Sequence, residues 1–463
     1  MRLEKDNFKD FLEYCLTELL NIVSKDIYLV GGLVRDKLLN VDSLDYDFVV
    51  SKDAFLISKE LAYKTGGALV VLDDVRDISR VVWNKERNNF DLNFDIAKIV
   101  GYSIEEDLSL RDLTINSIAI RFDTLSIKKL IDGKYNISEK DIFDPCNGYQ
   151  DLKNGIIKTN AIDNFISDPL RLIRAFRFSA KYNFKIEKNT SEYINQLGKL
   201  IVNPAKERVL KELFDILSIN NSSKFLEQMY KSDILYYLFQ DFNNLNKSLL
   251  IKSIDCICKY ELITKQIDDY FPYNEKIDKY LSENLIYNHS RKSLLKIVLL
   301  LANFKDYSIT MIEFLSKIEK LVKLYTFSSV EQNFILKNIC YYHQIENVLN
   351  IEINRTNLFL LFKERKKEVI SSLILHFIQT KDLKEQKIII EIYKLFIEDE
   401  LLSNPPSIIN GQELMKELNI PAGKIIGNLL NIIQKGQAEK IIKNKPEAIS
   451  YAKDYLKSIY TPQ

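Results

Sequence analysis

The sequence has few of the residues that most often bind transition metals or form disulfides. It holds three histidines and five cysteines in 463 residues, and the cysteines are odd in number and scattered. Cys256-Ile257-Cys258 lacks the second pair of ligands that a zinc site needs. No histidine has a neighbouring aspartate, so a His-Asp metal site is not expected. We therefore expect reduced thiols, structural histidines and a cytoplasmic protein.

Long apolar runs and an excess of one charge sign are also absent. The most apolar window, Leu294–Ala302, contains Lys296 and is about half as long as a bilayer-spanning helix. The first residues, Met1–Asp6, lack the apolar core of a signal peptide. Lys+Arg total 65 and Asp+Glu total 64, which leaves a formal net charge of +1. No membrane contact is expected, and a nucleic-acid partner would have to meet local basic patches.

The patterning predicts an α/β head followed by helical domains. A chain of this length suggests about two to four domains. Up to residue 142, apolar runs of strand type alternate with helical patterns, which favours an antiparallel or mixed sheet. We expect strands at Ile27–Val30, Asp47–Val50, Ala68–Leu72, Arg80–Trp83 and Phe90–Ile96, and helices at Leu33–Leu39, Ala54–Lys64 and Thr114–Ile120. Beyond Asp168 only helical patterns remain, so we predict a head (1–142), then an elongated all-α neck (143–218), body (219–403) and tail (404–463).

Two carboxylates follow a Gly-Gly turn in the most informative stretch. The first strand breaks at Gly31 and Gly32, and Asp45 and Asp47 stand two residues apart at the start of the next strand. The period of a strand places both carboxylates on one face. Mg²⁺ takes one or two carboxylates together with phosphate oxygens. The stretch therefore predicts a Mg²⁺ and nucleoside triphosphate site, with glycine amides and Arg35 facing the phosphates.

A second polar group, Arg111, Asp112 and Asn116, lies in the run Glu105–Ala119. Considered alone, the pattern is typical of a capped helix under a charged surface, with Asp112 or Thr114 as the cap.

A third segment contains Asp168 and Arg171, one turn apart at the start of a predicted helix. The pair could be a simple ion pair within that helix. It could also select a base, because a carboxylate accepts from the exocyclic amine of cytosine or adenine while a guanidinium donates to the ring nitrogen. Uracil and guanine present an N–H at that ring position. Arg174 and Arg177 continue the helix and could meet phosphate, or be surface cations.

The order and spacing of these segments resemble the bacterial-type (class II) tRNA nucleotidyltransferase and poly(A) polymerase family, a branch of the polymerase-β-like nucleotidyltransferases. The resemblance runs from about residue 26 to 218 and weakly includes the tail near Asn410-Gly411. It implies that Asp45 and Asp47 are catalytic and hold two Mg²⁺ ions. It further implies that residues 111–116 hold the ribose and triphosphate, and that Asp168 and Arg171 choose the base.

Two positions in the neck qualify this resemblance. Ser167 stands where the family pattern has Glu, so the resemblance assigns no side chain at that position to orient Arg171. The segment Asn203–Leu213, which includes Arg208, resembles a neck helix for which we expect a structural, buttressing role.

The resemblance also bears on the product. CCA-adding and A-adding members usually have a flexible loop after the strand that Phe90–Ala97 matches, but here only Lys98–Ile104 precedes Glu105. Absence of that loop is associated with enzymes that stop after two cytidines. We therefore expect addition of CC, or of CCA, to the tRNA 3′ end from CTP. ATP would be used if this protein completes the end, and otherwise a separate A-adding enzyme would complete it.

Other functions remain open at this point. A poly(A) polymerase or A-adding enzyme shares the head and neck. A decayed RNA-binding protein would be expected to have lost a carboxylate, and a small-molecule nucleotidyltransferase would not need so large a helical body. In the tail, lysines outnumber acids and suggest an RNA-binding patch, with a solvated helix face as the alternative: Lys440, Lys443 and Lys445.

Overall fold

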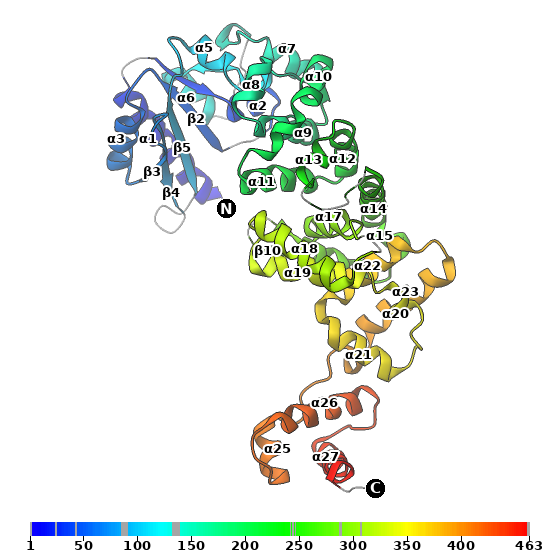
Figure 1. Cartoon of the computed structure of the whole chain (residues 1–463). Coiled ribbons are helices and arrows are strands. Elements are labelled where there is room, and N and C mark those ends of the chain that lie inside the picture. Colours follow the sequence, from blue (N-terminus) through cyan, green and yellow to red (C-terminus); the bar gives the residue numbers. More distant parts are fainter. Residues whose placement is uncertain are drawn as a thin grey trace. The chain divides into compact units, whose positions relative to one another are not determined.

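The computed structural model describes residues 2–23, 26–41, 44–84, 91–131, 139–240, 242, 245, 247–286, 289–305 and 308–460. The chain forms two compact units (Figure 1). The first comprises Met1–Ile216 and Lys231–Leu238, and the second comprises Leu217–Tyr230 and Phe239–Gln463. The finer division into head, neck, body and tail stays a prediction.

A seven-stranded mixed sheet with the order β3-β4-β5-β2-β1-β6-β7 organises the first unit. Strands β2 and β5 pair in parallel and the other neighbours are antiparallel, which confirms the mixed sheet predicted from the sequence. All five expected strands are present, although Phe90 lies outside the described residues. The strands are β1 (Ile27–Val30), β2 (Asp45–Val50), β3 (Ala68–Asp73), β4 (Ile78–Trp83), β5 (Leu92–Lys98), β6 (Ala119–Arg121) and β7 (Ile142–Phe143).

Helices α1 (Arg2–Ile22), α3 (Ala54–Thr65) and α6 (Thr124–Ile131) enclose the main apolar core of the head against the sheet (Figure 1). Phe48 and Trp83 are buried there, and both rings meet Phe94 edge-on. A smaller apolar cluster packs α5 (Ile104–Ser109) against β1 and β2. Because β2 is central and covered on both sides, the strand that carries the two carboxylates is rigidly supported.

The helix expected over Thr114–Ile120 is wrong. A single 3₁₀ turn, η1 (Thr114–Asn116), is followed by β6, which pairs with β1 along Tyr28–Val30. The apolar side chains of this short segment suit either a helix or a strand. The strand prevails because β1 would otherwise leave its backbone hydrogen-bonding groups unpaired inside the sheet.

Helices make up most of the rest of the first unit. They include α2 (Gly32–Leu38), α7 (Gly148–Asn154), α8 (Ile162–Ser167), α9 (Leu170–Tyr182), α10 (Lys188–Leu197), α11 (Lys206–Leu217) and α13 (Ile234–Leu238), with the 3₁₀ turns η2 (Glu139–Asp141) and η3 (Gly198–Val202). A two-stranded ladder joins β8 (Ile156–Ile157) to β9 (Lys185–Ile186).

The second unit is helical apart from the pair β10 (Asn284–Ile286) and β11 (His289–Ser290). Its helices are α12 (Ser222–Lys231), α14 (Lys247–Lys265), α15 (Ile267–Tyr270), α16 (Asn274–Ser282), α17 (Arg291–Ala302), α18 (Met311–Leu324), α19 (Ser329–Tyr342), α20 (Ile345–Leu349), α21 (Arg355–Arg365), η4 (Lys366–Glu368), α22 (Val369–Gln379), α23 (Leu383–Glu398), α24 (Glu400–Ser403), α25 (Gly411–Leu418), α26 (Lys424–Ala438) and α27 (Lys445–Tyr460). Helices α25, α26 and α27 share an apolar core of their own.

The apolar window noted in the sequence is the buried helix α17, where Lys296 pairs with Glu261 at 2.7 Å. Among the described residues, no helix combines the length and the apolar character needed to cross a membrane.

Candidate active site

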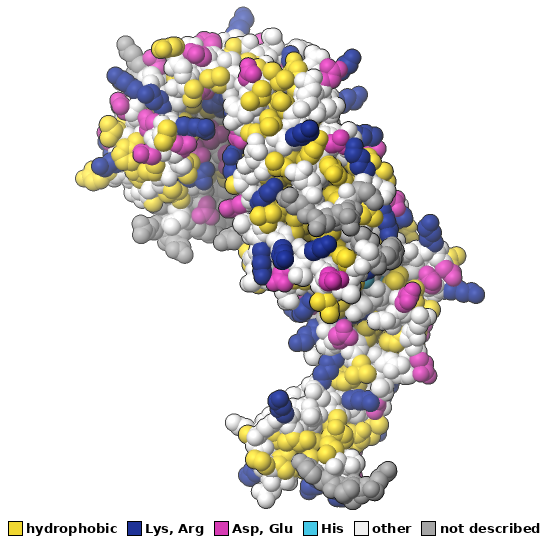
Figure 2. All heavy atoms as spheres, viewed as in Figure 1, with side chains coloured by type: hydrophobic (Ala, Val, Ile, Leu, Met, Phe, Trp, Pro, Cys, Tyr) yellow, Lys and Arg dark blue, Asp and Glu magenta, His cyan; other side chains and the backbone are white. Residues whose placement is uncertain are grey.

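A cavity of about 510 Å³ in the first unit brings together all twelve residues that the sequence assigned to metal or nucleotide. Those residues are Gly31, Gly32, Arg35, Asp45, Asp47, Arg111, Asp112, Asn116, Asp168, Arg171, Arg174 and Arg177. The lining also includes Asp36, Phe178, Lys181 and Arg208, which the sequence did not assign to a site. Figure 2 shows basic and acidic side chains gathered around a hollow in this unit.

Strand pairing sets the position of the carboxylates. Asp47 lies opposite Val30, the last residue of β1, so the chain turns at Gly31 directly beside it. Gly31 has φ +70°, and a Cβ there would stand 3.0 Å from Oδ2 of Asp47. Only glycine meets both conditions without strain. The backbone N–H of Gly32 donates to Asp47, while Asp45 at the start of β2 is exposed.

Like charges crowd Asp47. Its partner in the parallel register with β5 is Asp95, which Arg80 holds through two hydrogen bonds of 2.6 and 2.7 Å. Burial, followed by the charges of Asp95 and Asp45, raises the pKa of Asp47 to about 6, although Arg111 opposes the rise. A bound cation would relieve this repulsion. Asp95 was missed from the sequence because strand register brings it to Asp47.

The carboxylate pair fits Mg²⁺, which commonly takes one or two carboxylates and completes its shell with water and phosphate oxygens. Within the described part of the chain, no cluster of three or more histidines, cysteines, aspartates or glutamates forms a site enclosed by protein ligands alone. An open pair of this kind leaves coordination positions for a substrate.

The side chain of Arg111 also lies close to the turn at Gly31. Its guanidinium forms an ion pair with Asp107 at 3.0 Å, and Nη1 lies 3.5 Å from the position of a Cβ on Gly31. The cation therefore stands close to Asp47 at the mouth of the site, where a phosphate would meet it.

Arg35 is buried in the wall of the cavity. Its guanidinium pairs with the adjacent Asp36 at 2.8 Å and donates to Oδ1 of Asn116 at 2.5 Å. Two aromatic rings, Phe178 and Tyr182, lie within 4.9 and 5.2 Å of its central carbon. The arginine thus couples α2 to α9 and presents a fixed cation to the cavity.

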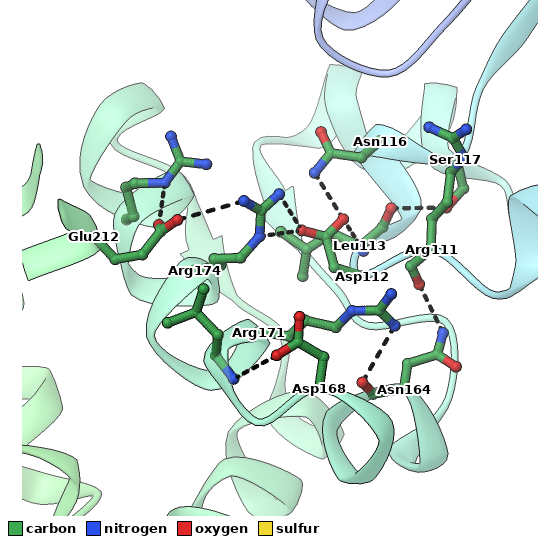
Figure 3. A network of polar contacts seen from close by, with 12 residues as sticks. Arg111, Asp112, Leu113, Asn116, Ser117, Asn164, Asp168, Arg171, Arg174 and Glu212 are labelled. Carbon is green, nitrogen blue, oxygen red and sulfur yellow. Dashed lines mark hydrogen bonds and ion pairs between the residues drawn. The ribbon is translucent and has the colours of Figure 1, made fainter. Parts of the chain in front are cut away.

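Asp112 is the centre of a buried polar network (Figure 3). One oxygen accepts from the Asn116 amide at 2.9 Å, and the other pairs with Arg174 at 2.7 Å. Burial opposes ionisation of Asp112, but Arg174 and the Asn116 amide keep its pKa below the ordinary value. Asp112 therefore acts on the cavity by holding these two side chains.

The network continues through Glu212 of α11. Arg174 reaches it at 3.4 Å (Figure 3). Arg177 pairs with it at 2.5 Å. Burial raises the pKa of Glu212 despite these two cations. The two arginines expected to meet phosphate are thus already paired with carboxylates, and they bind α9 to α11 and to the segment that contains Asp112.

Asp168 and Arg171 both line the cavity but have separate supports. Helix α9 begins at Leu170, and Asp168 accepts from its backbone N–H at 3.2 Å. Asp168 also pairs with Arg208 at 3.0 Å. Arg171 donates instead to the carbonyl oxygens of Leu110, at 3.0 Å, and Asn164, at 3.2 Å. No direct ion pair between Asp168 and Arg171 is needed to hold either side chain.

The lysines predicted to bind RNA belong to the second unit. Lys440 and Lys443 are exposed, whereas Lys445 pairs with Glu413 at 2.7 Å and so ties α27 to α25.

Three family models match the chain. They are described as the poly A polymerase head domain (residues 27–158), a probable RNA- and SrmB-binding site of polymerase A (183–245), and a putative domain 2 of tRNA nucleotidyltransferase (307–452).

Curated relatives agree with these matches. A CC-adding tRNA nucleotidyltransferase of Synechocystis sp. is 28% identical over 433 residues, which cover 93% of this chain and 94% of the relative. An A-adding tRNA nucleotidyltransferase of Halalkalibacterium halodurans is 29% identical over 237 residues, 45% of this chain and 51% of the relative. Among solved structures, a Thermotoga maritima CCA-adding enzyme complexed with tRNA matches with a TM-score of 0.67 and 21% identity, over 96% of this chain and 95% of that one.

A mixed sheet that presents paired carboxylates beside a Gly-Gly turn, continued by arginine-rich helices, is the architecture of polymerase-β-like nucleotidyltransferases. Within that class, the chain matches the poly A polymerase head and tRNA nucleotidyltransferase domain models and is similar along most of its length to a curated tRNA nucleotidyltransferase, in agreement with the family resemblance of its sequence.

Proposed function

We propose that this protein adds cytidine to the 3′ end of tRNA without a template, using CTP and releasing pyrophosphate. The observation that carries the proposal is the shared cavity, which contains both the strand carboxylates and the pair able to distinguish C and A from U and G. We also propose that Mg²⁺ is the cofactor and that Asp45 and Asp47 hold it.

Bound Mg²⁺ would supply Lewis acidity to activate the RNA 3′ hydroxyl and to neutralise charge on the leaving pyrophosphate. The side chains around it orient the substrate. Arg111 offers its guanidinium to the phosphates at the mouth, and Arg35 adds a fixed cation in the wall. Asp168 accepts from the exocyclic amine of the incoming base while Arg171 donates to its ring nitrogen.

Two observations support a product that ends in CC. The connection from β5 to α5 comprises only residues 99–103, which leaves no room there for the long loop of CCA-adding members. The Synechocystis relative, which is matched over 94% of its length, is named as CC-adding.

An A-adding or poly(A) product is the second candidate. Relatives named as A-adding match with similar identity but over about half of their length or less, as with the Halalkalibacterium halodurans and Aquifex aeolicus proteins. A decayed RNA-binding protein is disfavoured, because both carboxylates remain in place on β2.

One assay tests the proposal. Purified protein is given tRNA that lacks its last three nucleotides, with CTP, with ATP and with both, and product length is resolved on a gel. We expect extension by two nucleotides with CTP and no third nucleotide when ATP is added. A third nucleotide with both would indicate a CCA-adding enzyme, and long extension with ATP alone would indicate a poly(A) polymerase.

A further inference from the structure

Arg208 is the one cavity arginine that contacts the carboxylate of the base-selecting pair, here meaning Asp168 and Arg171. It projects from α11, and its Nη2 donates to Oδ2 of Asp168 at 3.0 Å. The other oxygen, Oδ1, accepts from the backbone N–H of Leu170. Both carboxylate oxygens therefore have a fixed donor, and the plane of the carboxylate is defined.

The exposure of Arg208 separates it from the structural arginines of the same region. Arg177 is 18% exposed and is paired with Glu212 and Asp215. Arg208 is 55% exposed, lines the cavity, and reaches a carboxylate that is itself 33% exposed. An arginine that only joined two helices would add little to the stability of the fold at this position, because exposed ion pairs contribute little to stability.

Arg171 does not orient the Asp168 carboxylate, since its guanidinium donates to the carbonyl oxygens of Leu110 and Asn164. Ser167 does not orient this carboxylate either. Its side chain is exposed and donates to the carbonyl of Asn164 at 3.1 Å. Among the side chains that the structure describes, Arg208 is thus the donor that orients Asp168.

We infer that Arg208 is a positioning residue that fixes Asp168 for base selection, an inference that rests on the proposed function. Each carboxylate oxygen can accept two hydrogen bonds, so one acceptor position per oxygen remains for the exocyclic amine of cytosine. Uracil presents a carbonyl at that place, and a fixed carboxylate repels it. Without Arg208, Asp168 can rotate away from the uracil carbonyl and meets the cytosine amine less often.

The test compares kcat and KM for CTP and UTP in the wild type and in three variants. In Arg208→Ala we expect the preference for CTP over UTP to narrow by roughly tenfold, the loss typical of one charge-assisted hydrogen bond. Arg208→Lys keeps one charged donor and should recover part of the preference. Lys211→Ala removes an exposed cation from the same helix, outside the cavity, and should leave the preference unchanged. Thermal unfolding of each variant checks the fold.

A double-mutant cycle tests whether Arg208 acts through Asp168. In an Asp168→Ala background, Arg208→Ala should change the CTP:UTP preference no further. The inference would be overturned if Arg208→Ala lowered kcat/KM equally for CTP and UTP. It would also be overturned if Arg208→Ala changed the CTP:UTP preference as much in the Asp168→Ala background as in the wild type. In either case, cytidine addition by the wild type would still stand. A wild type that incorporates neither nucleotide would contradict the proposed function itself and this inference with it.

Discussion

At the scale of single residues, the cavity concentrates like charges that the fold itself disfavours. Asp45, Asp47 and Asp95 lie on two neighbouring strands, and Arg80 and Arg111 oppose their repulsion. Such an arrangement of like charges lowers the stability of the folded protein, in the way that active sites commonly do.

Asp47→Asn should therefore stabilise the metal-free protein while removing its activity. The pKa of Asp47 rises from 3.8 to about 6 on folding, so the charged form destabilises the native state. The penalty is absent below the unfolded pKa, grows between the two values and is complete above about 6. In urea with chelator, we expect a gain of up to about 3 kcal/mol at pH 7.5 and much less at pH 4.5.

Asp74→Asn, at an exposed position in the turn between β3 and β4, is the matched control. It should change neither the free energy of unfolding nor the activity. An equal gain for Asp47→Asn at both pH values would contradict the assignment. Nucleotide incorporation by Asp47→Asn should be nearly lost while tRNA binding persists, since the change removes a proposed metal ligand and leaves the rest of the surface intact.

Arg171→Ala tests the base-selecting pair. Removing the guanidinium removes the donor that uracil and guanine cannot satisfy, so CTP incorporation should fall and its lead over UTP should narrow by about 1–3 kcal/mol. Steady-state kinetics with each nucleotide measure both effects. Arg121→Ala removes an exposed arginine of β6 outside the cavity and serves as control. An unchanged CTP:UTP ratio would leave Arg171 a structural contact to Leu110 and Asn164.

At the scale of elements, the sequence predicted the strands better than their partners. Apolar runs of strand type predicted β1 to β5, and the glycine pair predicted the turn after β1. Pairing between β2 and β5 could not be predicted, because about forty residues separate them and the register depends on the assembled sheet. For the same reason Asp95 was not assigned to the site, although it lies beside Asp47. Arg208 was not assigned because only the packing of α11 brings it to Asp168.

Two glycine substitutions test how closely the elements pack around the site. A Cβ on Gly148 of α7 would stand 1.9 Å from the carbonyl oxygen of Thr114, in the 3₁₀ turn that carries Asn116. Gly148→Ala should therefore lower the free energy of unfolding by about 2–3 kcal/mol and reduce incorporation. Gly427 lies inside α26 with open space around it, so Gly427→Ala should stabilise by up to about 1 kcal/mol. Urea unfolding compares the two, and equal effects would refute the close packing of α7.

At the scale of the whole molecule, the near-neutral net charge conceals an uneven distribution. The cavity of the first unit gathers arginines, and the tail of the second gathers exposed lysines. The sequence predicted both the arginines and the lysines, because residues of each group lie close together along the chain. It could not show that Lys445 is engaged by Glu413, which depends on how α25 and α27 pack.

Replacing Lys440 and Lys443 by Glu tests the tail as an RNA-binding surface. If these exposed lysines meet tRNA phosphates, the KM for tRNA should rise, its salt dependence should weaken, and incorporation at saturating tRNA should change little. Lys445 is left in place because its loss would break the pair with Glu413. The charge-matched control replaces the exposed Lys384 and Lys387 of α23. An equal KM change in both double variants would reflect net charge alone.

The parallel pairing of β2 with β5 also has a consequence for how the protein is made. β1 and β2 are neighbours in the chain, but the second partner of β2 arrives only after α3, β3 and β4 have been synthesised. Until then, β2 is an open edge with unpaired backbone groups, and contacts so distant in sequence form slowly. The strand that carries Asp45 and Asp47 therefore stays half-paired on the ribosome while residues 51–91 are synthesised, and β1 beside it waits longer still, until its second partner β6 (Ala119–Arg121) has been made.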